Sequence, residues 1–177
     1  PGHHLPDLTS ISDAALVKAL RDLRARNAEP RGAILQLAVV TDCLRRMGLR
    51  DGRAERAAML RELLRDLAWT GLCQARGLVN GSRPPMSADC FPADPAADFR
   101  GDHADRQAWS AVWYRFLSDE APSGDALQQV AGMARPTFWR RQKAGVALLG
   151  QALKAAELEA RRGLPGPDVP PPRAPDA

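Results

Sequence analysis

Apolar residues recur at intervals of three and four along most of this chain, and no stretch alternates apolar and polar residues over the length of a strand. This periodicity predicts helices over about residues 12–26, 30–47, 53–76 and 103–118. Pro30 and the Asp51-Gly52 pair separate the first three helices. Ser10 with Asp13 has the spacing of a capping box ahead of the first one. The pattern therefore predicts an all-α fold.

Two of these helices have a distinctive side-chain pattern. Four arginines lie outside the leucine stripe of the third helix, and we expect them to cover an outer face: Arg53, Arg56, Arg61 and Arg65. The helix over residues 103–118 concentrates Trp109, Trp113 and Phe116. Their spacing is typical of a buried stripe and favours a core role over a platform for stacking bases.

Gly and Pro residues interrupt the helical pattern between 78 and 102, which predicts an irregular linker there. The linker would separate an N-terminal helical bundle at 10–77 from a second domain at 103–162. Residues 1–9 read as a non-native or disordered leader, and the Pro-rich tail at 163–177 is predicted to be disordered or extended.

The second domain contains the spacing of two helices joined by a tight turn. Asp125 is predicted to cap a short helix, Gly132 supplies the permissive backbone of a sharp turn, and Met133 fills the corner. Pro136 fits the first turn of the next helix. Phe138 then lies where the second helix must return an apolar side chain towards the first.

This segment, from about Asp125 to Gly145, resembles the helix-turn-helix of bacterial transcription regulators. Five residues match the family pattern: Ala131, Gly132, Met133, Thr137 and Phe138. The chain departs from it at Gln128, where alanine is usual, and at Ala134, where serine often caps the second helix. The resemblance implies that a recognition helix over about residues 136–146 enters the major groove of double-stranded DNA.

The charge of the recognition helix agrees with this expectation, because no acidic residue follows Asp125 until Glu157. Arginine can bind phosphate or guanine with two hydrogen bonds, and glutamine can pair with adenine. The predicted DNA contacts are Arg135, Thr137, Trp139, Arg140, Arg141, Gln142 and Lys143. The helical phase predicts an inward line through Phe138, Arg141, Gly145, Leu149 and Ala152. It leaves Arg140 and Lys143 outside.

The same helix continues to about Arg162, which is far longer than a recognition helix requires. The apolar residues of its far half must be buried elsewhere. They would either fold back on the helix at 103–118 or pair with a second copy of the chain. A homodimer would suit a palindromic DNA site, and we expect one.

Composition adds limited information. The net charge of +4 and the pI near 9.4 favour anionic partners. No apolar run is long enough to cross a bilayer, and the odd, widely spaced Cys43, Cys73 and Cys90 favour a reducing compartment. We therefore expect a soluble, cytoplasmic protein without membrane contact.

The sequence also lacks the patterns of an enzyme, since it contains no Gly-rich phosphate loop, nucleophile elbow or Ser/His/Asp grouping. We expect no cofactor and no metal. A zinc site built from Cys73, Cys90 and His103 would lack the usual ligand spacing. The acidic residues between 89 and 105 are explained as well by solvation as by cation binding.

The leading hypothesis is a DNA-binding transcriptional regulator, from a housekeeping system or from a bacterial defence or phage system. Its N-terminal helices would serve dimerisation, a protein partner or effector sensing. The alternative is a non-catalytic interaction module, because the order of elements loosely resembles sigma factors and the helical regions attached to large signalling ATPases. Burial of the basic face against the first three helices would favour that alternative.

Overall fold

A computed structural model describes residues 7–25, 30, 32–78, 95–119 and 121–163, and confirms the all-α prediction: the described residues form helices and no strands. The α-helices are α1 (Asp13–Arg24), α2 (Ala38–Arg46), α3 (Arg53–Ala75), α4 (Ala104–Val112), α5 (Gly124–Ala131) and α6 (Arg135–Arg162). Shorter elements are the 3₁₀ helices η1 (Leu8–Ser10), η2 (Ala33–Gln36) and η4 (Pro95–Phe99), and the π-helix η5 (Trp113–Leu117), which continues α4. None of the described helices combines the length and apolarity needed to span a membrane.

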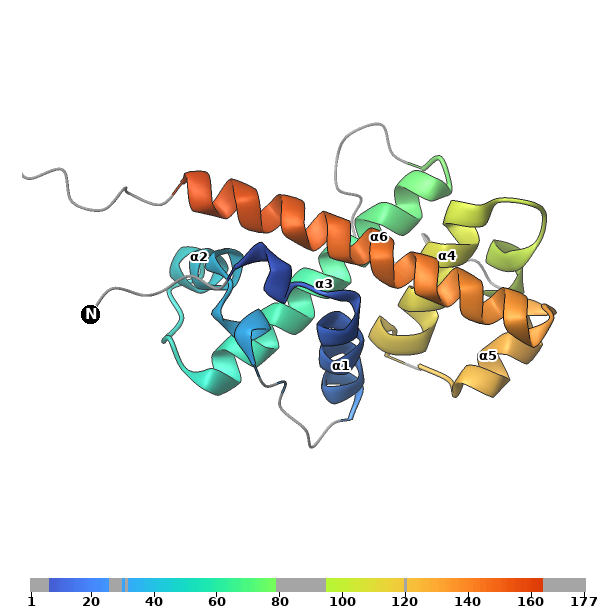
Figure 1. The fold of residues 1–177 in the computed structure, drawn as a ribbon, viewed down its shortest axis with the longest axis horizontal. Helices are drawn as coiled ribbons and strands as arrows, with labels where there is room; N and C mark the ends of the chain where they lie inside the picture. Colours follow the sequence, from blue (N-terminus) through green and yellow to red (C-terminus); the bar gives the residue numbers. More distant parts are fainter. Residues whose placement is uncertain (1–6, 26–29, 31, 79–94, 120, 164–177) are drawn as a thin grey trace, which may run out of the picture.

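The long helix α6 organises the fold. Its 28 residues extend about 42 Å at 1.5 Å per residue. Figure 1 shows α6 crossing the whole molecule, with α4 along its N-terminal half and α1 and α2 beside its C-terminal half. Each of α1, α2, α3 and α4 contacts it. The far half of α6 is thus covered within the chain, and its apolar stripe does not require a second copy.

Two glycines allow the central helices to pack closely. A Cβ atom on Gly145 of α6 would collide with the carbonyl oxygen of Ala108 and approach Val112 Cγ2 to 2.7 Å. A Cβ on Gly71 of α3 would overlap the Trp109 ring. Because interiors are packed as densely as organic crystals, neither position has room for a side chain. These glycines therefore fix the distances from α4 to α6 and from α3 to α4.

One hydrophobic core runs through both predicted domains. It includes residues of α1, η2, α2 and α3 together with residues of η4, α4, η5, α5 and α6. At its centre the rings of Trp69 and Trp113 lie 5.3 Å apart, and both residues are almost fully buried. The helices of 10–77 and 103–162 therefore share their core. Most of the predicted linker, at 79–94, lies outside the described residues, as do residues 1–6 of the leader and 164–177 of the tail.

Two local predictions in the N-terminal half were wrong. The cap of α1 is Ser12, whose side chain accepts from the Ala15 N–H at 3.2 Å, so the prediction of a cap at Ser10 was wrong. The predicted helix over 30–47 divides at Leu37, where extended ψ separates η2 from α2. Leu37 is fully buried, so the break carries its side chain into the core.

A buried carboxylate stabilises the start of α2. The N-cap residue of α2, Leu37, has no side-chain acceptor for the free N–H groups of the first turn of α2. Glu157 of α6 is fully buried, and its Oε2 accepts from the Val39 N–H at 2.9 Å while its Oε1 accepts from Arg161 Nε at 2.7 Å. An anion at a helix N-terminus is favourable, so this contact ties α2 to the far end of α6.

A second buried polar cluster lies at the C-terminal end of α3. Arg76, just after α3, forms two hydrogen bonds to the Asp98 carboxylate, from Nε at 2.9 Å and from Nη2 at 2.5 Å. Tyr114 also donates to Asp98, at 2.9 Å. Burial and the neighbouring carboxylate raise the pKa of Tyr114 well above its usual value. The cluster therefore joins the end of α3 to η4 and η5.

Candidate nucleic-acid interface

The helix α5 meets α6 through a three-residue turn, Gly132 to Ala134. Ser123 caps α5, with its Oγ accepting from the Ala126 N–H at 3.1 Å, so the prediction that Asp125 is the cap was wrong. Gly132 ends α5 with φ of 62°, the left-handed conformation that glycine adopts without strain. Leu127 is the buried anchor of α5. The position of the turn was therefore predicted correctly from the sequence, whereas the N-cap of α5 was not.

Gln128 lies at one of the two positions where the sequence departs from the helix-turn-helix pattern. Its Nε2 donates to the carbonyl oxygen of Met133 at 2.6 Å. That bond joins the middle of α5 to the turn and satisfies a main-chain carbonyl outside both helices. An alanine at this position would leave the turn without this connection. The amide side chain therefore braces the angle at which α6 departs from α5.

The start of α6 carries no acidic side chain. Its N-cap residue Ala134 provides no side-chain acceptor, and Pro136 occupies the first turn. The main-chain N–H groups of Thr137 and Phe138 both bond to the carbonyl of Ala134. Since no acidic residue lies in this first turn to neutralise the positive end of the helix dipole, the turn favours an anionic partner.

The predicted inward line of α6 is confirmed at Phe138, Gly145 and Leu149 and is wrong at Arg141 and Ala152, which are only half-buried. Phe138 is fully buried, with its ring centroid 6.4 Å from that of Phe99, as expected. The inward line, however, continues through Gln142, which is only 9% exposed, and not through Arg141. Arg141 is half-buried, and its Nε donates to Gln107 Oε1 on α4 at 2.9 Å. Close packing on α4 selects this phase, and it removes Gln142 from any surface that reads bases.

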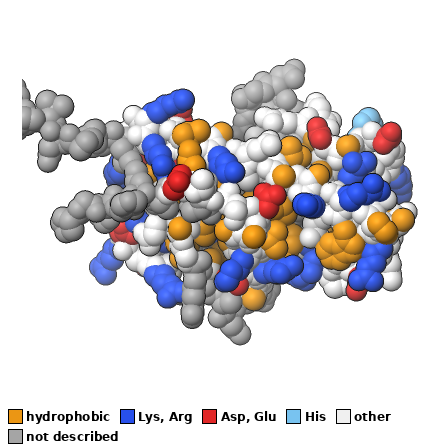
Figure 2. Space-filling model, viewed as in Figure 1, with side chains coloured by type: hydrophobic (Ala, Val, Ile, Leu, Met, Phe, Trp, Pro, Cys, Tyr) orange, Lys and Arg blue, Asp and Glu red, His pale blue; other side chains and the backbone are white. Residues whose placement is uncertain are grey.

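Three exposed cations remain around the first turns of α6: Arg135, Arg140 and Lys143, here called the basic surface. Arg140 and Lys143 lie one turn apart on the outside of the helix, and Arg140 Nη2 contacts Thr137 Oγ1 at 3.3 Å. A hollow of about 140 Å³ lies between Thr137, Arg140 and Arg141. Figure 2 shows Lys and Arg side chains gathered at the end of the molecule formed by α5 and the start of α6, around an apolar area.

Trp139 and Val130 contribute apolar surface at this end, with 39% and 44% of their areas exposed. The Trp139 ring packs edge-on against Phe138, with centroids 5.8 Å apart. It also lies beside Gly124, where a Cβ would approach the ring to 3.2 Å. Trp139 therefore covers the contact of α5 with α6 while one side of its ring faces solvent.

Of the seven predicted DNA contacts, the structure leaves Arg135, Trp139, Arg140 and Lys143 exposed, and half-exposes Thr137 and Arg141. Sequence reasoning missed a second cationic site. Arg61 and Arg65, expected on an outer face of α3, are half-buried and line a pocket with Arg24. Arg56, expected on the same face, is buried and donates to the Leu35 carbonyl at 2.8 Å. The signal was available in the Arg61 and Arg65 spacing of four, which places both side chains on one side of α3.

Comparisons with known proteins found no similarity that assigns this chain to a family. No protein-family model matches the sequence, and no curated protein or solved structure resembles it significantly. Among the described residues, no three His, Cys, Asp or Glu side chains lie close enough together to hold a metal ion. Cys90 and Asp89 lie outside the described residues.

Proposed function

We propose that this protein binds double-stranded DNA through a helix-turn-helix formed by α5 and α6, and acts as a transcriptional regulator. The supporting observation is the basic surface, which is exposed at the start of a helix that carries no acidic side chain near it. Between Asp125 and Glu157 the sequence has five basic residues and no acidic one, and Glu157 itself is buried. Such a local bias suits the phosphate backbone.

In this proposal the outer side of α6 faces the major groove. Small residues follow the basic ones on that side, with Ala144 exposed and Ala147 half-exposed, so the helix can approach base edges closely. Arg140 would bind guanine or phosphate, Lys143 and Arg135 would bind phosphates, and Thr137 would contact a phosphate or a thymine methyl group. Arg141 is held by Gln107 and would play a lesser part.

The alternative, a protein-interaction module, has one observation in its favour. Met47 and Leu49, in the turn between α2 and α3, are 68% and 47% exposed and lie in the N-terminal half that would meet a partner. Burial of the basic face against α1 to α3 would favour this alternative; α6 contacts these helices, but Arg140 and Lys143 on its basic face are exposed. DNA binding is therefore the function that the arrangement supports best.

The test is fluorescence anisotropy of labelled duplex DNA with the protein and two double variants. R140A/K143A removes two cations of the basic surface. R50A/K154A is the matched control, because it removes one exposed arginine and one exposed lysine elsewhere and changes the net charge equally. We expect the first variant to bind DNA at least tenfold more weakly and the control to bind within about twofold of the wild type. Equal losses in the two variants would contradict the proposal.

A further inference from the structure

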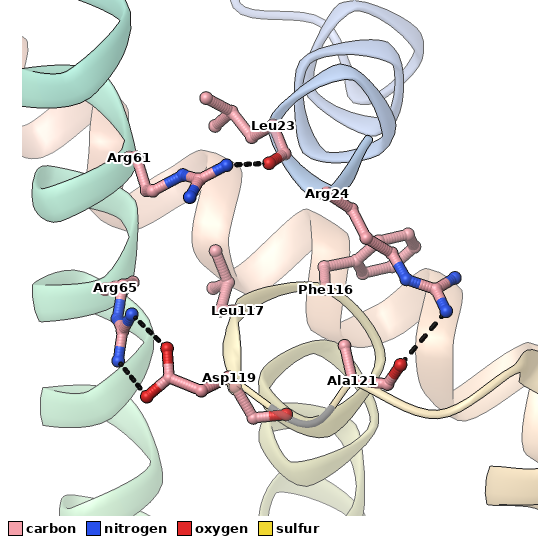
Figure 3. A pocket seen from close by; sticks show the side chains of 9 residues that line it. Leu23, Arg24, Arg61, Arg65, Phe116, Leu117, Asp119 and Ala121 are labelled. Carbon is pink, nitrogen blue, oxygen red and sulfur yellow. Dashed lines mark hydrogen bonds and ion pairs between the residues drawn. The ribbon is translucent and has the colours of Figure 1, made fainter. Parts of the chain in front are cut away.

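A pocket of about 300 Å³ opens between α1, α3 and the residues that follow η5. Its polar side is formed by Arg24 of α1 and by Arg61 and Arg65 of α3. Phe116 and Leu117 of η5 form an apolar wall. Figure 3 shows the three guanidinium groups around this space, which we call the arginine pocket.

The charges of the arginine pocket do not balance among the residues that line it. Asp119 is the carboxylate among these lining residues, and Arg65 binds it with Nη1 and Nη2 at 2.8 and 3.4 Å. The hydrogen bond from Arg65 and the charge of Arg61 hold the pKa of Asp119 below its usual value, so it is ionised at neutral pH. Among the described residues that line the pocket, one carboxylate thus accompanies three guanidinium groups, and two positive charges remain.

Among the described residues, the partners of the remaining two arginines are main-chain oxygens. Arg24 Nη2 donates to the carbonyls of Ala121 and Pro122 at 3.0 and 3.1 Å, and Arg61 Nη2 donates to the carbonyl of Leu23. Each guanidinium has five N–H donors, so both keep donors for an incoming group. Planar guanidinium groups bind carboxylates and phosphates with paired hydrogen bonds. A half-buried position strengthens such a contact relative to open solvent.

We propose that the arginine pocket binds a small organic oxyanion, either a carboxylate or a phosphate ester, whose apolar part lies against Phe116 and Leu117. The volume is at the lower end of ligand pockets, which limits the ligand to a compact molecule. Arg24 and Arg61 would hold the oxyanion. Arg65 would give up part of its contact with Asp119 and bind the oxyanion as well.

The pocket is linked to the start of α5. The carbonyls that Arg24 binds belong to Ala121 and Pro122, immediately before Ser123, the cap of α5. Arg115 also donates to the Pro122 carbonyl, at 3.1 Å. An anion that draws Arg24 away would weaken its two hydrogen bonds and alter how the residues just before α5 are held against α1. This coupling rests on the proposed function, and it makes the ligand an effector that lowers DNA affinity.

Binding is tested without DNA, by isothermal titration calorimetry with phenyl phosphate, benzoate, inorganic phosphate and the neutral control benzamide. We expect saturable binding of phenyl phosphate or benzoate, weaker binding of inorganic phosphate and none of benzamide. Arg24→Gln and Arg61→Gln should each weaken binding at least tenfold, while Arg50→Gln, an exposed control outside the pocket, should not. Circular dichroism checks that each variant is folded.

Absence of saturable binding by both organic anions, or undiminished binding in both folded pocket variants, would overturn the pocket proposal. Equal affinity for inorganic phosphate and phenyl phosphate would overturn the role of the apolar wall. The coupling is tested separately by repeating the DNA titration with saturating ligand, where we expect at least a fivefold loss of DNA affinity. Ligand binding by a protein that fails to bind DNA would uphold the pocket and contradict only the proposed function.

Discussion

Replacing Phe138 by alanine tests both the phase of α6 and the packing at the corner of the two helices. The Phe138 side chain is fully buried and packs against Phe99 and Trp139. Its transfer from water contributes up to about 3 kcal/mol, and the cavity left by the ring adds a further penalty, since the neighbouring helices cannot collapse fully. We expect Phe138→Ala to lower the free energy of unfolding by about 4 kcal/mol.

The matched control is Trp139→Ala, at the next position. Trp139 has the larger side chain, but 39% of its area is exposed, so its removal should cost less than half as much. Urea denaturation followed by circular dichroism gives both losses. In a chain of this size the expected loss at Phe138 corresponds to a fall in Tm of about 8–16 °C. A greater loss at Trp139 than at Phe138 would refute the phase that the structure assigns to α6.

Two further predictions concern buried polar groups. Glu157→Ala should lower the free energy of unfolding by about 3 kcal/mol, because the Val39 N–H loses its buried acceptor, whereas Glu159→Ala, at an exposed ion pair, should change it by less than about 0.5 kcal/mol. Equal urea midpoints for these two variants would contradict the capping role of Glu157. Because burial raises the pKa of Tyr114 in the folded state, that state holds its proton while the unfolded state releases it above about pH 10; stability should therefore be fully present below that pH and fall as pH rises beyond it. Tyr114 is the only tyrosine, so the phenolate absorbance reports it alone, and an ordinary titration near pH 10 in the folded protein would refute the prediction.

Much of the fold was predictable, because the spacing of apolar residues along the sequence is enough to indicate an amphipathic helix. The bounds of α3 and the turn at Gly132 followed from leucine periodicity and from one glycine. The break at Leu37 did not, because two short helical elements and one long helix share the same apolar spacing. Glu157 shows more clearly what sequence patterns cannot predict. It accepts a hydrogen bond from Val39, 118 positions earlier, and no local pattern contains that contact.

The candidate site shows the same division. Exposure of Arg140 and Lys143 followed from the helical phase, since both lie away from Phe138. The position of Gln142 depended on how α4 crosses α6, which Gly145 fixes through its contact with Ala108 and which one-dimensional spacing does not report. The arginine pocket arises in turn from residues of α1, α3 and η5 that meet only in the folded chain.

The most direct test of the central claim is the salt dependence of DNA binding. For B-DNA, the logarithm of the affinity falls with the logarithm of the salt concentration by about 0.9 for each phosphate contact. The account predicts a steep slope for the wild type and, in R140A/K143A, a slope smaller by about one if Arg140 binds guanine or by about two if it binds phosphate, with R50A/K154A unchanged. A wild-type slope that the loss of Arg140 and Lys143 leaves unaltered would contradict DNA binding by the basic surface.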